Sequence, residues 1–335
     1  MARERARGAV ALMAVLPSLR LRSLSGKDPA AYERHVLHAT SRTYAETNCY
    51  ADIIIELLHA CGYEPLAAFA HVVRLDFEGD QWTFFKPPPE DLERLYGIDI
   101  HEMQPYRPIP VQIAEQIELG RTVIVELDSW FLPDTASTTY RAEHVKTSVA
   151  ADAIDVRGEV LHYFHSAGLF ELSGEDFRGI FRLDGHAADV LPPYAELVRF
   201  DSGERLQGEK LLSASRALLR SHLEHRPADN PFHRFGTQLT RALPDLLEQG
   251  PDAYHAYAFA TVRMAGSAFE ALGTYADWLS GGQTVASEPM REIVDACKAM
   301  SFRLARRRAF DAEPLIAAMG AAWERTIEAL GHLAG

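Results

Sequence analysis

The sequence predicts an α+β protein in which a mixed helix-and-strand domain is followed by an all-α domain. The chain has 335 residues, which is long for one core and fits two domains. Its apolar fraction of 47% is sufficient to fill both cores. Strand-like runs alternate with short helices up to about residue 205, and helical spacing of apolar residues dominates after it. We therefore predict domains over residues 28–204 and 205–335, preceded by a leader over residues 1–27.

The leader combines a basic start, residues 1–7, with an apolar run, residues 8–16. This pattern resembles a short signal peptide, but Pro17 ends the run and no small-x-small cleavage site follows. We interpret the leader as poorly ordered and the protein as cytoplasmic. The three cysteines form no CxxC pair, which argues against disulfides and a structural zinc site and fits a reducing cytoplasm.

In the first domain, caps and apolar spacing predict helices over residues 28–40, 48–62, 89–96 and 111–119. Strand-like runs occupy residues 67–77, 122–127, 145–151, 159–165 and 196–200. The run 122–127 is apolar almost throughout, which is typical of a buried central strand. Residues 152–158 hold a turn, so 145–151 and 159–165 are expected to form an antiparallel hairpin. In the second domain, helices are expected over residues 209–225, 236–249, 253–279, 289–307 and 313–333.

Cys49 is the candidate nucleophile, because it directly follows the expected N-cap Asn48. Unsatisfied N–H groups and the helix dipole favour a thiolate at such a position, and the same N–H groups can serve as an oxyanion hole. A cysteine at a helix start is nevertheless most often a small buried residue. Cys61 lies on the apolar face of the same helix and is expected to be a core residue.

His144 is the candidate base, because it opens an expected strand after a polar loop. In a hairpin centred near residue 155, the residues opposite His144 are His165 and Ser166, which we expect to orient its ring. The nearby aspartates Asp152 and Asp155 lie too far along the hairpin for that role. Two other acidic residues, Asp134 and Glu143, are expected to be solvated loop charges. The QWTFF segment, residues 81–85, is expected to pack rather than to bind a ligand.

These residues resemble a known family pattern. Asn48-Cys49, then ELDSWFLPD over residues 126–134, then Glu143-His144 and a hydrophobic strand are similar to the N-terminal domain of the butirosin-biosynthesis acyltransferase family. The same order is similar to that of the bacteriocin-leader peptidases, a papain-like group. The resemblance covers residues 35–200. The chain also resembles a bacterial family without an established activity that shares the helical half, including ADNPFHRF over residues 228–235 and HAYAFATVR over residues 255–263.

The resemblance implies a papain-like cysteine-nucleophile domain with Cys49 as nucleophile and His144 as base. Asn48, Asp128 and Trp130 are then expected to contribute to the oxyanion or substrate site. Enzymes of the butirosin type move an acyl group from a carrier-protein thioester to an amine. The implied partners are therefore an acyl carrier protein, which carries the phosphopantetheine, and a small-molecule amine acceptor. No bound cofactor is expected.

Three functions remain open from the sequence. The first is an acyl or aminoacyl transferase acting in biosynthesis. The second is a cysteine peptidase or amidase, which is disfavoured because papain-like peptidases usually carry Gln six residues before the nucleophile, where this chain has Thr43. The third is a non-catalytic papain-like binding protein, in which Cys49 shows ordinary thiol reactivity.

Charge and motifs narrow the classes of partner. A net charge of −13 and a pI near 5.5 disfavour binding to nucleic acid or an anionic membrane, since both repel an acidic protein. The sequence has no apolar stretch of roughly 18 residues that could span a membrane. It contains no P-loop, no HExxH and no spacing typical of metal ligands, so no metal is expected. The pattern does not indicate an oligomeric state.

Overall fold

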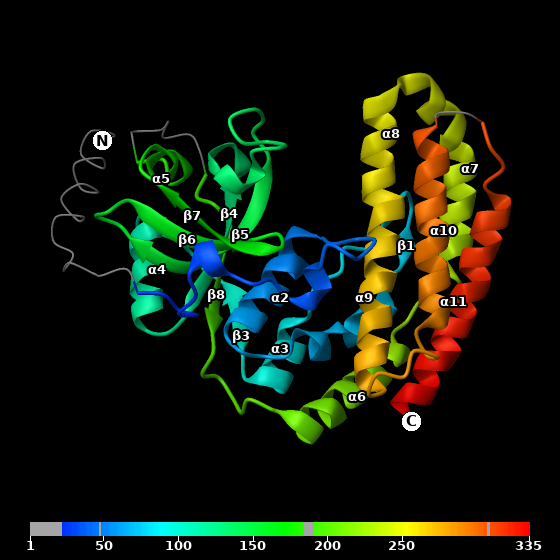
Figure 1. The fold of residues 1–335 in the computed structure, drawn as a ribbon, viewed down its shortest axis with the longest axis horizontal. Coiled ribbons are helices and arrows are strands. Elements are labelled where there is room, and N and C mark those ends of the chain that lie inside the picture. The colour runs from blue at the N-terminus through cyan, green and yellow to red at the C-terminus, as the bar shows by residue number, and fades with distance from the viewer. Residues whose placement is uncertain (1–21, 47, 184–190, 307–308) are drawn as a thin grey trace. The chain divides into compact units, whose positions relative to one another are not determined.

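The computed structural model describes residues 22–46, 48–183, 191–306 and 309–335 (Figure 1). The chain forms two compact units. The first, which we call the sheet unit, contains the described residues up to His35 together with Asp52–Tyr63 and Tyr96–Glu204. The second, the helical unit, contains Val36–Ala51, Glu64–Leu95 and the chain from Arg205 to its end. A boundary therefore falls at Glu204, but two earlier segments group with the C-terminal helices.

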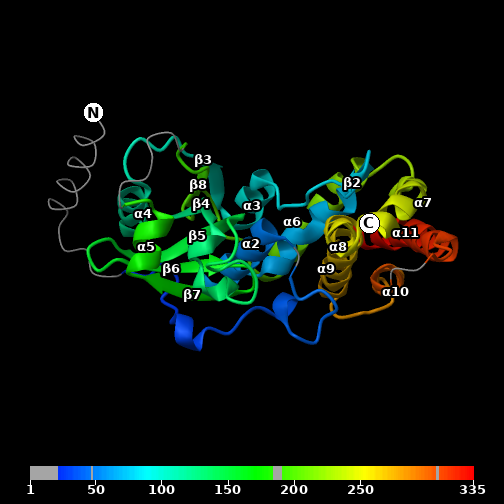
Figure 2. The ribbon, with the colours of Figure 1, turned by 90° about the horizontal axis from the view of Figure 1, so that it is seen from above.

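Among the described residues, the sheet unit is built on a six-stranded sheet in the order β3-β8-β4-β5-β6-β7, with every neighbouring pair antiparallel (Figures 1 and 2). The strands are β3 (Asp99–Glu102), β4 (Thr122–Asp128), β5 (Lys146–Asp155), β6 (Val160–His165), β7 (Gly168–Ser173) and β8 (Ala195–Arg199). The predicted central strand is confirmed as β4, and the predicted hairpin as β5–β6. The edge strands β3 and β7 are short and had no distinct sequence signal.

Helices α4 (Ile109–Glu118) and α5 (Glu175–Ile180) complete the core of the sheet unit. Their apolar side chains belong to one buried cluster with side chains of β4, β5, β6 and β7. Tyr163 and Phe177 are fully buried in this cluster. Their burial removes large apolar areas from water and fixes the strands that carry the candidate site.

Helix α2 (Cys49–Ala60) begins and ends as the sequence predicts. Asn48 Oδ1 accepts the Ala51 N–H at 2.9 Å, which is an N-cap bond. At the other end Gly62 has a φ of 76°, and the N–H groups of Gly62 and Tyr63 return to His59 and Leu58. This is a Schellman cap, in which glycine adopts the left-handed conformation without steric cost.

Two predictions before residue 80 are wrong. Residues 28–40 form only the short 3-10 turns Pro29–Ala31 and Val36–His38 instead of a helix. Residues 67–77 do not form a strand, because Pro65–Arg74 is a helical segment, η3. Nearly all of η3 is buried, so its apolar run shows neither the alternation of a strand nor the stripe of an amphipathic helix.

The helical unit confirms the predicted C-terminal helical region. Its helices are α6 (Gly208–Glu224), α7 (Pro231–Gln249), α8 (Pro251–Ala258), α9 (Met264–Leu279), α10 (Glu288–Ala305) and α11 (Glu313–Ala334), with the short α3 (Pro89–Tyr96) before them. A π-helical turn, Phe259–Arg263, separates α8 from α9 inside the single helix expected over residues 253–279. Helices α9, α10, α11 and α7 lie side by side and are seen lengthwise in Figure 1.

The small hairpin β1 (Phe77–Glu78) and β2 (Gln81–Trp82) packs on α7. Trp82 is 4% exposed, and its ring centroid lies 5.1 Å from that of Phe232. The expected packing role of the QWTFF segment is confirmed for Trp82 and Phe85, whereas Phe84 is exposed.

Most of the expected leader, residues 1–21, lies outside the described residues. Its last part is held against the sheet, contrary to the expectation of poor order. Ser23 bridges to Ala153, its Oγ donates to Asp152 at 2.6 Å, and the Ser25 N–H donates to the same carboxylate at 2.9 Å. Across the described part of the chain, no helix combines the length and apolar character that crossing a membrane requires.

Candidate functional site

The loop between β4 and β5 carries most of the candidate site of the sheet unit. Asp128 is the last residue of β4 and pairs in register with Lys146, the first residue of β5. The Ser129 N–H donates to the Val145 carbonyl at 2.9 Å and closes the loop at its neck. His144 directly precedes this closure. The neck therefore brings Asp128 and His144 together, although they are 16 positions apart in sequence.

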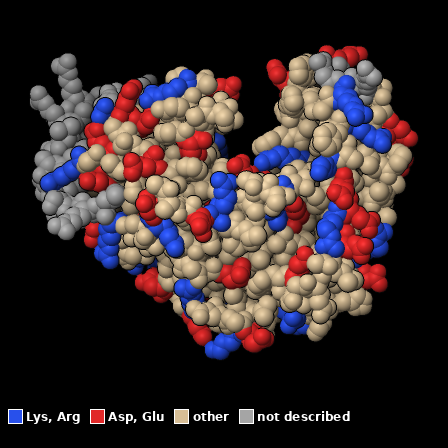
Figure 3. All heavy atoms as spheres, in the orientation of Figure 1, with Lys and Arg blue, Asp and Glu red and all other residues tan. Residues whose placement is uncertain are grey.

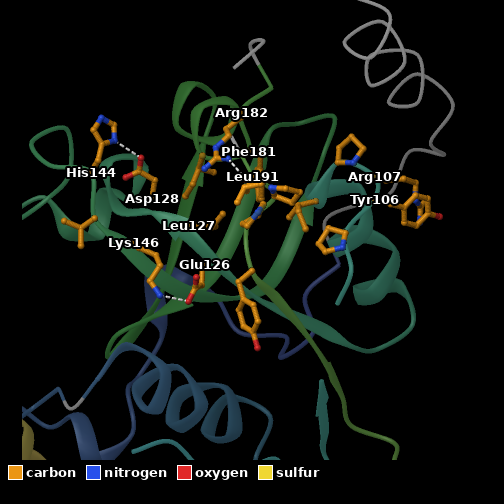
Figure 4. Close-up of a pocket in the computed structure, with 18 residues that line it drawn as sticks. Tyr106, Arg107, Glu126, Leu127, Asp128, His144, Lys146, Phe181, Arg182 and Leu191 are labelled. Carbon is orange, nitrogen blue, oxygen red and sulfur yellow. Dashed lines mark hydrogen bonds and ion pairs between the residues drawn. The ribbon is translucent and has the colours of Figure 1, made fainter. Parts of the chain in front are cut away.

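His144 and Asp128 form a hydrogen-bonded pair, with 2.7 Å between Nδ1 and Oδ2 (Figure 4). A carboxylate oxygen only accepts, so Nδ1 carries the proton and the neutral ring keeps a lone pair on Nε2. The Trp130 ring stacks on the imidazole at 4.5 Å and 11°. The Trp130 N–H also donates to Asp128 Oδ1 at 3.1 Å. Three predicted site residues thus converge, and a ring oriented in this way can act as a general base.

The expected orientation of His144 by His165 and Ser166 is wrong. The ring of His165 lies between other groups: Nδ1 donates to Asp134 Oδ2 at 2.5 Å and Nε2 accepts from the Thr147 hydroxyl at 2.9 Å. Ser166 occupies the β6–β7 turn with a φ of 45°. His165 belongs to β6, which is only one of the two neighbours of β5. An interior strand has a neighbour on each side, and the partner of His144 comes from β4.

Asp134 is a buried anchor of the loop and not the solvated charge that we expected. Its side chain is 5% exposed and accepts from both His165 and the Tyr163 hydroxyl, each at 2.5 Å. Burial, and then the Asp134 carboxylate, raise the pKa of Tyr163. Further along the loop, Arg141 pairs with Asp176 of α5 at 2.5 Å. Both ends of the loop body are therefore fixed to the sheet unit, which holds the neck residues in place.

A pocket of about 640 Å³ lies beside the pair (Figure 4). Its apolar walls include Ile109, Leu127, Ile180, Phe181 and Leu191. Apolar walls with a few convergent polar groups are typical of small-molecule sites.

The polar groups of this pocket come mainly from the ends of β4 and β5. Besides Asp128 and His144, Lys146 donates to Glu126 at 2.6 Å inside the pocket. Arg182 lines the opposite wall, where its guanidinium donates to the Leu191 carbonyl at 3.0 Å. The pocket therefore offers both signs of charge beside an apolar surface.

Cys49 and Asn48 belong to the helical unit. Cys49 is a free, partly exposed thiol in the first position of α2, where backbone N–H groups have no intrahelical acceptor. Asn48 caps this turn, and its Nδ2 donates to the Phe85 carbonyl at 2.9 Å. The Lys86 ammonium lies 4.5 Å from the centroid of the Tyr50 ring, next to Cys49 in the chain. The first turn of α2 therefore offers its own backbone N–H groups, and the Lys86 ammonium lies against the ring of Tyr50 in that turn.

The other two cysteines differ from Cys49 in their surroundings. Cys61 is partly exposed after the end of α2 and is not the core residue that we expected. Cys297 is buried in α10, and this burial raises the pKa of its thiol to about 12. A thiol that resists ionisation is a poor nucleophile, so Cys297 is not a candidate for the reactive thiol.

Charges of both signs are mixed on the surface. On the face of each unit that Figure 3 shows, Lys and Arg side chains are interspersed with Asp and Glu. The described residues of that face form no extended basic surface of the kind that binds nucleic acid.

Two family models match the chain. The DUF1839 N-terminal domain matches residues 33–200, and the DUF1839 C-terminal domain matches residues 208–332. No curated protein matches the sequence.

Proposed function

The chain belongs to the DUF1839 family, and we propose that this member is a cysteine-dependent acyl or aminoacyl transferase. The Asp128–His144 pair carries the proposal. The Asp128 carboxylate holds Nδ1 of His144 and leaves Nε2 available. A histidine in this arrangement can activate a nucleophile and then an acceptor.

Cys49 is the proposed nucleophile. Its place in the capped first turn of α2 supports this role, because helix N–H groups stabilise a thiolate and the oxyanion that follows attack. A cysteine at a helix start, followed along the chain by a histidine before a strand, also supports a papain-like relationship. That relationship is part of the proposal.

The proposed reaction has two balanced steps. Cys49 gives its thiol proton to His144 Nε2, and its sulfur attacks the thioester carbonyl of an acyl group on a carrier protein. The bond between the carbonyl carbon and the carrier sulfur breaks, and the carrier thiol takes the proton. An amine then attacks the acyl-cysteine, His144 accepts the amine proton, and the Cys49 sulfur leaves. The products are an amide and a free carrier thiol.

The pocket beside His144 is the proposed acceptor site. The acceptor amine meets the Asp128–His144 side, and the remainder of the molecule lies on the apolar wall formed by Leu127 and Phe181. Phosphopantetheine belongs to the carrier partner in this proposal.

Mass spectrometry of the protein after incubation with acyl-loaded carrier proteins tests the first step. We expect an acyl adduct on Cys49 that is lost in Cys49→Ser and kept in Cys61→Ser, the matched thiol control. An added amine should discharge the adduct in the wild type and much more slowly in His144→Ala. Failure of every loaded carrier to acylate Cys49, when iodoacetamide labels the same residue, contradicts the proposal.

A cysteine peptidase or amidase is the alternative that uses the same groups with water as acceptor. The free Cys49 and the Asp128–His144 pair suit it equally. Thr43 weighs against it, since this position lacks the side chain that helps peptidases to bind an oxyanion on an unactivated amide. Two results together favour this alternative. The wild type turns over a peptide library and Cys49→Ser does not, and no loaded carrier acylates Cys49 in the wild type. In a non-catalytic binding protein, neither reaction occurs.

A further inference from the structure

The segment that leads to Cys49, residues 42–46, is held by α9 and by the π-helical turn before it. All of these residues belong to the helical unit. The Thr43 N–H donates to Glu270 Oε1 at 2.9 Å, and the Tyr44 N–H donates to Glu270 Oε2 at 2.8 Å. One carboxylate of α9 thus binds two successive backbone N–H groups, a charge-assisted arrangement that fixes the path of the chain.

Arg42 extends this contact. Its Nη1 donates to Thr274 Oγ1 at 2.9 Å, one turn further along α9, and its Nη2 lies 3.7 Å from Glu270 Oε2. The side chains of Arg42 and Glu270 are 13% and 17% exposed. The ion pair is therefore largely removed from water and is only weakly screened by salt.

A close steric contact and a further hydrogen bond hold Tyr44 and Glu46. A Cβ placed on Gly266 would lie 2.4 Å from the Tyr44 ring, so α9 carries a glycine where that ring crosses it. Arg263, at the end of the π-helical turn, donates from Nη2 to the Glu46 carbonyl at 3.1 Å. Beyond Glu46, the next described anchor is Asn48, which is bound to Phe85 and caps the turn of Cys49.

We infer that α9 is the positioning element of the Cys49 nucleophile, with Glu270 as its principal positioning residue and Gly266 as its steric counterpart. The inference rests on the proposed role of Cys49 and deepens it. The helical C-terminal half then has a direct task in the reaction, because it presents the N-terminus of α2 in one conformation.

The same contacts include Thr43, the position at which papain-like peptidases carry glutamine. Its backbone N–H is occupied by Glu270, so this position contributes to holding the chain. Precise placement of a nucleophile is worth up to about 100-fold in rate, since a displacement of about 1 Å can cost that factor.

Two variants disturb the segment by different means. Glu270→Gln removes the charge and one of the two acceptors, and Gly266→Ala inserts a methyl group against Tyr44. Each has a matched control. Gly273→Ala adds a methyl group to the same helix where the nearest side-chain atom lies 3.5 Å away, and Glu292→Gln breaks an exposed pair with Arg325 in the helical unit.

The experiment measures, in the full-length protein, the rate of Cys49 alkylation by iodoacetamide against pH, the rate of Cys49 acylation by a loaded carrier, and the thermal midpoint. We expect Glu270→Gln and Gly266→Ala to change the pH profile of Cys49 alkylation and to slow acylation by about 10- to 100-fold. In the two test variants, the rate of Cys61 alkylation should equal that of the wild type. In the two control variants, the rates of Cys49 alkylation and acylation should also equal those of the wild type.

The outcomes separate the inference from the proposed function. If both variants alkylate Cys49 with the wild-type pH profile, the positioning role is overturned, whatever the protein does with carriers. A lower thermal midpoint with unchanged Cys49 kinetics also overturns it, because that result shows only a structural role. A changed alkylation profile in a protein that no carrier acylates supports the positioning role and rejects the transferase.

Discussion

Among single residues, Asp128 determines what His144 can do. The carboxylate holds Nδ1, and Trp130 stacks on the ring from one side, so the imidazole has one tautomer and one orientation. His144 itself is 67% exposed, so few other contacts restrain it. Among the described residues, this hydrogen bond and this stacking contact are the interactions that orient the ring.

Asp128→Asn should lower the rate of amine-dependent discharge of acyl-Cys49 by about 100- to 10,000-fold, because an amide in place of the carboxylate favours the wrong imidazole tautomer. Rapid-quench measurement of acyl-enzyme decay gives this rate. Glu171→Gln is the matched control, since it breaks a similar carboxylate–imidazole pair with His162 elsewhere in the same sheet. Wild-type decay in Asp128→Asn would show that the pair has no role in the reaction.

At the scale of elements, η3 shows how burial changes the chemistry of a histidine. His71 is buried, and its Nδ1 donates to the Ala68 carbonyl at 2.8 Å. Its Nε2 is buried without a hydrogen-bond partner among the described residues. Burial lowers the pKa of His71 to about 4, from an ordinary value of 6.5. The folded protein therefore keeps this ring neutral.

This shift predicts loss of stability in acid. Between pH 6.5 and about 4 the unfolded chain binds a proton at His71 that the folded chain does not, so the free energy of unfolding falls as the pH falls. Because of His71, the free energy of unfolding is about 3 kcal/mol larger above pH 6.5 than at about pH 4. Urea unfolding at pH 7.5 and pH 4.5 measures it.

His71→Gln should lose most of that pH dependence, because the amide does not titrate and can still donate to the Ala68 carbonyl. The exposed His225 provides the control, and His225→Gln should keep the wild-type dependence. An equal loss of stability in acid for His71→Gln and the wild type would exclude His71 as its source.

In the whole molecule, each of the two units is built from several separate segments of the chain. Residues 36–51 and 64–95 group with the C-terminal helices, and η3 packs on α6 and α9. The family models and the sequence pattern both divide the chain between residues 200 and 208. The N-terminal part therefore contains a buried segment that packs mainly on two helices of the C-terminal part.

A fragment of residues 1–204 should accordingly fail to fold as the full chain does. The apolar surface of η3 would be exposed to water, and surfaces of this kind promote aggregation. We expect an insoluble fragment, or one without a cooperative thermal transition, and partial rescue by co-expression of residues 205–335 as a separate chain. Circular dichroism and size-exclusion chromatography measure this. A soluble, cooperatively unfolding fragment would show that the N-terminal part is autonomous.

Local signals account for what the sequence predicted correctly. The cap residues Asn48 and Gly62 mark the two ends of α2. The apolar run of β4 identifies a central strand, and the turn after β5 identifies its hairpin. In each case the residues that decide the structure are neighbours in the chain. Propensity and periodicity express such effects directly. The position of Cys49 at a helix start follows from the same signals.

Tertiary structure alone decided which groups meet. Asp128 reaches His144 through the β4–β5 register, Asp134 reaches His165 across 31 positions, and Thr43 reaches Glu270 across 227. None of these pairs has a local signature, because the free energy that joins them comes from packing of whole elements and not from adjacent residues. The sequence by itself determined that Cys49, the proposed nucleophile, lies at the start of its helix. Only the packed structure determined what orients the His144 ring and what holds the segment before Cys49.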